Sequence, residues 1–168
     1  ATAGLVWAVI EKVKFGRSSL VGIVTGVVAG LATVTPASGF VGPLGGVILG
    51  ALGSLICFHC VGPVKSKLKL DDSLDVFAVH GVGGIIGTLL TGVFAATALG
   101  GVGFAEGITM GKQIMIQLTG IAATVIWCGA VTFVLLKLVD MFVGLRVTAE
   151  QETEGLDTVL HNETGYNL

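Results

Sequence analysis

Charged side chains are scarce in this chain. Only 12% of its 168 residues are Asp, Glu, Lys or Arg, about half of the roughly 25% typical of a soluble domain. None of these four residue types lies between Ser18 and Val64. Hydrophobic residues make up 53% of the sequence, and the mean hydropathy is +0.94. The shortage of charge therefore excludes an ordinary soluble domain and predicts a membrane protein.

Other absences exclude whole classes of function. The sequence has no Gly-x-Ser-x-Gly motif, no paired catalytic carboxylates and no phosphate-binding loop, so we expect neither an enzyme nor a bound cofactor. It has no basic cluster that indicates nucleic-acid binding. It also lacks a starting Met and a basic segment before its first apolar residues, so we do not expect these residues to be a signal peptide. We expect these first residues to be the end of a membrane helix in a longer protein.

Cysteine is rare as well, with residues only at 57, 60 and 128. All three lie in apolar runs, where disulfides are not expected, so we interpret them as small buried hydrophobic residues. The segment Cys57-Phe58-His59-Cys60 has the spacing of a metal site. Zinc takes about four ligands, however, and no second cluster accompanies this segment. We therefore expect no metal.

Glycine is plentiful, with 27 residues, which suits closely packed membrane helices. Since a membrane-spanning helix needs about 20 residues, the long uncharged stretch must contain two, separated by the Pro- and Gly-containing segment 35–43. Residues 1–146 are then an all-α transmembrane domain and 147–168 a polar tail. The spanning helices are expected at about 18–34, 44–62, 75–98 and 113–145, after the end of a helix at 1–10.

The basic residues are unevenly placed. Of the nine Lys and Arg, eight lie in segment 11–17, in segment 63–74, or near the last apolar run and the tail. Four crossings put these regions on one side of the membrane and segments 35–43 and 99–112 on the other. Because Lys and Arg accumulate in cytoplasmic loops, we predict a multi-pass protein of the plasma membrane with a cytoplasmic carboxyl terminus.

His80 lies inside one of these uncharged helices. An ionisable group at that depth is costly in hydrocarbon, so it usually faces a cavity or a pathway. The alternative is a histidine that is hydrogen-bonded between packed helices, and the surrounding glycines suit either interpretation. Asp72, Ser73 and Asp75 precede this helix and are candidates for its cap. The cluster of carboxylates also suits a vestibule for cations.

Five stretches resemble, in their order and spacing, the carboxyl-terminal part of the ammonium transporter (Amt/Rh) family. They are Thr35–Gly39, Asp71–Gly84, Thr91–Ala95, Gly100–Gly107 and the tail from Gly144 to Asp157. The most specific is Asp75-Val76-Phe77-Ala78-Val79-His80-Gly81, which resembles the second pore-histidine motif. The tail resembles that of Amt members rather than Rh proteins.

The resemblance implies a polytopic transmembrane helical bundle that is half of the ammonium transporter fold, which has an inverted-repeat architecture and forms a homotrimer. The remaining half of the transporter would supply another pore histidine, which hydrogen-bonds to His80. Val76 corresponds to a pore-lining position and Asp75 to the carboxylate beside it. In the tail, the segment that a PII-type signal protein uses corresponds to Arg146, Glu150, Gly155 and Asp157.

The function that this resemblance implies is transport. Ammonium is recruited, loses its proton and crosses the lipid bilayer as ammonia, and the proton moves separately along the histidines. The alternative is an ammonium sensor of the same family that signals through its tail. A third hypothesis is a membrane scaffold that does not conduct.

Overall fold

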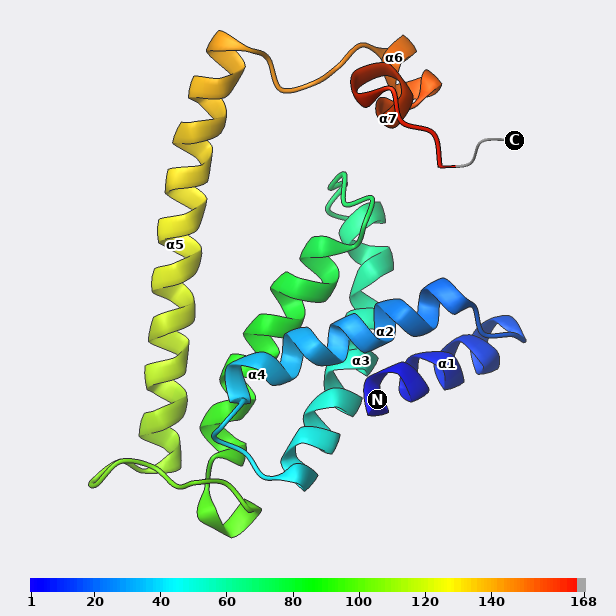
Figure 1. Cartoon of the computed structure of the whole chain (residues 1–168). Helices are drawn as coiled ribbons and strands as arrows, with labels where there is room; N and C mark the ends of the chain where they lie inside the picture. The colour runs from blue at the N-terminus through cyan, green and yellow to red at the C-terminus, as the bar shows by residue number, and fades with distance from the viewer. Residues whose placement is uncertain (166–168) are drawn as a thin grey trace. The chain divides into compact units, whose positions relative to one another are not determined.

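The computed structural model describes residues 1–165, which form helices joined by short loops (Figure 1). Four helical segments are long and apolar enough to cross a membrane: Leu20–Ala37, Pro43–Ser66, Phe77–Phe94 and Met110–Phe142. The elements are α1 (Thr2–Phe15), α2 (Leu20–Val34), η1 (Thr35–Ala37), α3 (Pro43–Ser66), η2 (Phe77–Gly81), α4 (Val82–Phe94), η3 (Thr97–Leu99), α5 (Met110–Phe142), α6 (Ala149–Glu154) and α7 (Leu156–His161). The all-α, multi-pass prediction is confirmed.

The end of α3 differs from the prediction because this helix continues past a proline, a residue that usually breaks helices. We expected a loop from Pro63, but α3 continues to Ser66. Proline lacks an N–H donor and its ring crowds the preceding turn, but its carbonyl still accepts the N–H groups of Lys67 at 2.9 Å and Leu68 at 3.1 Å. Burial of Val64, which is 4% exposed, favours this additional turn.

The chain forms two compact units, residues 1–122 and residues 123–168. In the first unit, α1 to α4 approach closely through small residues. A side chain at Gly26 would collide with Trp7, and one at Gly53 or Gly87 would collide with Thr33. The Ser54 hydroxyl donates to the Ala3 carbonyl at 2.7 Å, which ties α3 to α1. These close approaches account for the many glycines.

The loops of the first unit meet in two groups. The end of α1, the start of α2, the end of α3 and Asp75 line one cavity of about 390 Å³. At the other group, the Val102 N–H donates to the Phe40 carbonyl at 3.0 Å. Segment 11–17 thus lies near Gly62 and Asp75, which flank segment 63–74, and segments 35–43 and 99–112 lie together. This arrangement fits the predicted alternation. The side that faces the cytoplasm stays a prediction.

The second unit contains the later part of α5 and the tail. With 33 residues, α5 is roughly 50 Å long, and none of its residues is buried. In the tail, α6 begins with a capping box, in which the Thr148 and Gln151 side chains each bond to the other residue's backbone N–H. The proposed membrane and tail domains, 1–146 and 147–168, remain a prediction.

Candidate pore face and regulatory tail

The motif around His80 forms an irregular start to a helix rather than a plain α-helix. Residues Phe77–Gly81 make a π-helical turn, in which the Val82 N–H reaches the Phe77 carbonyl five residues back. Such turns are rare and are frequently found at functional sites. The predicted helix from Asp75 to about Ala98 did not anticipate this turn.

Asp72 caps the π-helical turn. Its Oδ2 accepts the backbone N–H groups of Phe77 at 3.0 Å and Ala78 at 3.2 Å. Two N–H groups that lack a partner within the helix are thereby satisfied. Of the three candidates that precede the helix, Asp72 is therefore the cap. Ser73 instead donates its hydroxyl to Asp71 Oδ1 at 3.1 Å.

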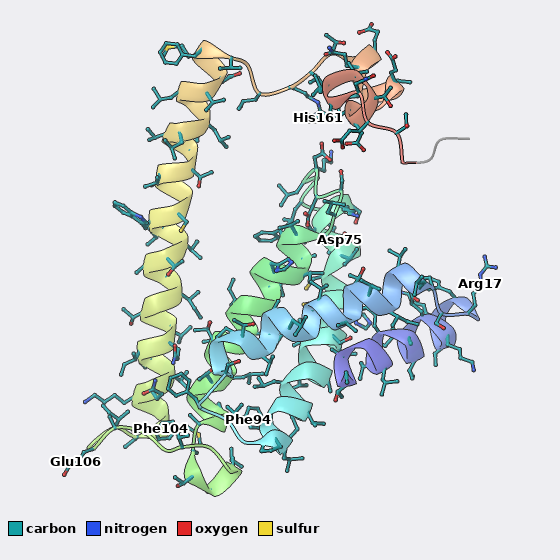
Figure 2. All side chains as sticks on the ribbon, viewed as in Figure 1. Arg17, Asp75, Phe94, Phe104, Glu106 and His161 are labelled. Atoms are coloured by element: carbon teal, nitrogen blue, oxygen red, sulfur yellow. The ribbon has the colours of Figure 1, made fainter. Side chains whose placement is uncertain are left out.

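Asp75 has a different role from Asp72. Its carboxylate faces the ammonium of Lys65 in the last turn of α3, with 2.7 Å between Oδ1 and Nζ. Its backbone has φ of 57°, a left-handed conformation that Asp tolerates better than most residues. Figure 2 labels Asp75 at the loop between α3 and the π-helical turn.

The helix that carries His80 has a buried face and an exposed face. Ala78 is 0% exposed and Val79 is 2% exposed, and the buried Cys57 thiol donates to the Val79 carbonyl at 3.7 Å. Val76 is 53% exposed, and His80 is exposed as well. Both interpretations of this histidine, as a pathway residue or as one hydrogen-bonded between packed helices, stay predictions.

The predicted tail residues lie in the two short helices α6 and α7 or in the segments beside them. Arg146 Nε is 2.6 Å from Glu152 Oε1, and Gly155, with φ of 104°, joins α6 to α7. Glu150 lies in the first turn of α6 and Asp157 in the first turn of α7. A hydrogen bond from its own backbone N–H, and a second from the Thr148 hydroxyl, lower the pKa of the Glu150 carboxyl from its ordinary value of 4.5.

The side chains of the Cys57–Cys60 segment contact different parts of the first unit. Cys57 lies in the core with Trp7 and Val79, and His59 Nδ1 is 2.8 Å from the Leu55 carbonyl of its own helix. Among residues 1–165, no group of three or more His, Cys, Asp and Glu side chains could hold a metal ion. The contact between Cys57 and the π-helical turn was missed by the sequence analysis, which treated Cys57 only as a small apolar residue.

Comparison with known proteins decides the family. The model of the Ammonium Transporter Family matches residues 1–166. The chain belongs to the ammonium transporter family. A curated ammonium transporter from Aquifex aeolicus is 45% identical, with 100% of this chain and 39% of the relative covered. One from Bacillus subtilis is 41% identical, with 99% of this chain and 42% of the relative covered.

Solved structures of this family share the fold. Mep2 from Saccharomyces cerevisiae matches with a TM-score of 0.74 and 36% identity, covering 89% of this chain and 35% of that chain. A structure described as a sensor Amt protein matches with a TM-score of 0.84 and 29% identity, covering 95% and 38%. The resemblance noted in the sequence is thus confirmed. The chain spans about two fifths of the length of the curated relatives it matches.

Membership in a transporter family fits the expectation that the chain is not an enzyme. It does not test the roles of individual residues. His80, Val76 and Asp75 remain the predicted pore residues, and Arg146, Glu150, Gly155 and Asp157 remain the predicted regulatory ones. The structure brings the first three together on one short segment and the other four together in the tail.

Proposed function

We propose that this chain forms part of the pore of an ammonium transporter. One observation carries the proposal: His80 lies on the exposed face of a helix whose opposite face is buried. An imidazole facing lipid would be costly, so this face needs another polar or water-filled environment. The 45% identity to the Aquifex aeolicus ammonium transporter supplies the substrate class.

The chemistry follows from the cost of moving a charge through a dry pathway. Ammonium that loses its proton crosses as neutral ammonia and avoids the large cost of burying an unpaired cation. Potassium cannot lose a proton and is rejected by the same step. The His80 imidazole, whose ring nitrogens can donate or accept a proton, accepts a hydrogen bond from ammonia or relays the released proton. Val76 lines the pathway on the same exposed face.

The open face of His80 also indicates what completes the pore. In this proposal, the remaining half of the transporter covers Val76 and His80 and contributes a second histidine. The assembled protein is a homotrimer in the lipid bilayer, with one pore in each subunit. The length of the curated relatives, of which this chain covers about two fifths, supports the additional half.

Ammonium-dependent current in liposomes tests the proposal. In the full-length protein that contains this chain, His80→Ala and His80→Asp are expected to reduce the current by roughly tenfold or more, or to alter selectivity, at normal protein yield. His59→Ala is the matched control, because the His59 ring contacts a carbonyl of its own helix and should leave the current unchanged. Wild-type current and selectivity in both His80 variants would refute the pore.

An ammonium sensor is the second hypothesis, and the fold likeness to the sensor Amt protein supports it. A sensor could keep the same ligand site while it signals through the tail. It is the less well supported hypothesis, because the curated relatives from Aquifex aeolicus and Bacillus subtilis both carry the name of ammonium transporters. Sustained ammonium current in liposomes would separate transport from both sensing and a non-conducting scaffold.

We also propose that the protein lies in the plasma membrane with its carboxyl-terminal tail in the cytoplasm. Segments 11–17 and 63–74 face the cytoplasm as well. The basic residues of these segments support this orientation. A membrane-impermeant thiol reagent, applied to intact cells, should label Gly101→Cys but not Lys14→Cys or Lys67→Cys. External labelling of Lys67→Cys would reverse the orientation.

The tail, in this proposal, binds a PII-type signal protein. Its two short helices, held by the Thr148 capping box and the Arg146–Glu152 ion pair, present a defined acidic surface. Deletion of residues 148–168 should preserve membrane insertion and weaken partner binding in a pull-down with purified PII-type protein. If binding is the same after this deletion, the tail has no such role.

A further inference from the structure

The buried residues of α4 form a stripe along the helix. Successive residues of an α-helix lie about 100° apart around its axis. Measured from the buried Gly83, the buried Gly87 and Thr91 therefore lie at about 40° and 80°. If the same α-helix continued unbroken toward its start, Val76 would lie at about 20° and His80 at about 60°. Both proposed pore residues would then belong to the buried stripe.

The π-helical turn Phe77–Gly81 changes this arrangement. It adds one residue to the helix, which rotates the segment before it by up to about 100°. Val76 is 53% exposed and His80 is also exposed, so neither lies in the stripe. Ala78, which an unbroken helix would place roughly opposite the stripe, is instead 0% exposed. The additional residue thus explains why Val76 and His80 lie on the exposed face.

The buried stripe has no room for an imidazole. A Cβ added at Gly83 would lie 3.1 Å from Thr33 Oγ1 and 3.4 Å from Cys57 Sγ, and one at Gly87 would collide with the Thr33 backbone. A His80 ring directed at this face would require α2 and α3 to move apart. The π-helical turn is therefore needed both for the packing of these helices and for the place of His80.

A side chain of α3 contacts the π-helical turn directly beside His80. The Cys57 thiol donates to the Val79 carbonyl at 3.7 Å. This carbonyl also accepts the Val82 N–H from only three residues away, so the hydrogen bonding of the helix is irregular here. Cys57 is 0% exposed, and water therefore does not compete for the contact. A thiol is a weak donor, but a hydrogen bond is stronger in such a dry environment.

We propose that Cys57 is a positioning residue for His80. Its thiol stabilises the π-helical turn at the Val79 carbonyl, and the turn keeps the adjacent imidazole on the exposed face. Loss of this hydrogen bond loosens the turn, and a small displacement of a reacting group is enough to slow its reaction. The inference rests on the proposed transport function, and it names a residue of α3 that acts on the pathway only through His80.

Ammonium current and potassium flux in liposomes that contain the full-length protein test this role. Cys57→Ala removes the donor and should lower the current about fivefold, as the loss of one hydrogen bond allows. The ratio of potassium flux to ammonium current, the potassium-to-ammonium ratio, should change in the same direction as in His80→Ala. Cys60→Ala, on the same helix, is the control and should keep the wild-type current. A wild-type current in Cys57→Ala would refute the proposal.

Cys57→Ser separates the hydrogen bond from the packing of the sulfur. Serine keeps a donor, and Ser54 of the same helix already donates its hydroxyl to the Ala3 carbonyl of another helix. Cys57→Ser should therefore retain most of the wild-type current. Because alanine and serine both remove the volume of the sulfur, equal losses in the two variants would assign the effect to packing and reject the positioning role. If Cys57→Ala does not accumulate, Cys57→Val, which fills the site without a donor, replaces it with the same expected results.

A signal from His80 itself distinguishes positioning from general damage. Solid-state NMR of the full-length protein with ¹⁵N-labelled histidine rings gives resonances, and those that are lost in His80→Ala belong to His80. Their chemical shifts should move in Cys57→Ala and stay at the wild-type values in Cys57→Ser and Cys60→Ala. Unmoved His80 resonances in Cys57→Ala would overturn the inference, even if its current or unfolding temperature falls.

The inference and the proposed function fail on different measurements. If His80→Ala leaves current and selectivity unchanged, the proposed pore is wrong, while moved His80 resonances in Cys57→Ala would still support the positioning role. If His80→Ala reduces the current but Cys57→Ala keeps both the wild-type current and the wild-type His80 resonances, only the inference about Cys57 is wrong.

Discussion

The helix that carries His80 has two faces with different surroundings. On one face, Val79 contacts Cys57 of α3, and Gly87 lies against the backbone of Thr33 in α2. On the other, Val76 and His80 are exposed in the part of the chain that the structure describes. The buried face determines how the helix packs, and the exposed face is free to contribute to a pathway. Substitutions on the two faces should therefore affect different measurements.

The largest effect on stability is expected at Gly87. A Cβ at this position would collide with the backbone carbonyl of Thr33, which cannot rotate away as a side chain can. Gly87→Ala should lower the free energy of unfolding by about 1–3 kcal/mol or prevent folding. Thermal unfolding of the purified full-length protein in detergent measures this change.

Gly84→Ala is the matched control for Gly87→Ala. It lies on the same helix, and within residues 1–165 no heavy atom beyond its chain neighbours and the nearby backbone of its own helix lies within 4 Å of an added Cβ. Its unfolding temperature should not fall below that of the wild type, because alanine is favoured over glycine inside a helix. Equal destabilisation by the two substitutions would mean that general helix effects, and not the contact with α2, determine packing here.

A smaller and more specific difference is expected between two valines. Val79→Ala removes a buried side chain and should lower the free energy of unfolding by about 1–3 kcal/mol, while the potassium-to-ammonium ratio stays unchanged. Val76→Ala, at a side chain that is 53% exposed, should keep stability and change the ammonium current. Both variants need thermal unfolding and liposome currents. The opposite outcome, with stability lost only at Val76, would reverse the assignment of the faces.

Much of this arrangement could be predicted from the sequence. The uncharged runs and the Pro- and Gly-containing segment 35–43 were sufficient to count the spanning helices, and the acidic residues before His80 predicted a cap. The two faces were harder to separate, because residues 76–79 are all apolar and show no periodicity. One signal was present: Val79, Gly83 and Gly87 are spaced four apart, as expected for residues on one face of a helix.

The π-helical turn and the Lys65–Asp75 pair could not be predicted. The turn depends on Asp72 reaching across the loop to Phe77 and Ala78, which no local pattern encodes. The ion pair depends on α3 continuing past Pro63, a residue that normally argues for the end of a helix. Both features arise from contacts between segments that are packed together only in the folded chain.

The smallest effect is expected in the tail, which lies outside the helix that carries His80 and so has neither its buried nor its exposed face. The lowered pKa of the Glu150 carboxyl means that this side chain favours its ionised form when α6 is folded. This contribution is present above the ordinary pKa of 4.5 and is lost as the pH falls through the lower folded pKa. The protection of the amides of residues 149–154 against hydrogen exchange, corrected for the intrinsic exchange rate at each pH, should therefore fall at acidic pH in the full-length protein. Glu150→Gln should weaken this pH dependence, and an unchanged dependence would assign it to another group.

The structure of the full-length protein in a lipid bilayer tests the central claim most directly. The account predicts that the His80 imidazole lies on a pathway through the subunit, at a hydrogen-bond distance of about 2.7–3.2 Å from a second imidazole outside this chain. Val76 should line the same pathway, and Val79 should still pack against Cys57. A His80 side chain that faces lipid, or that lies among apolar side chains away from any pathway, would contradict the account.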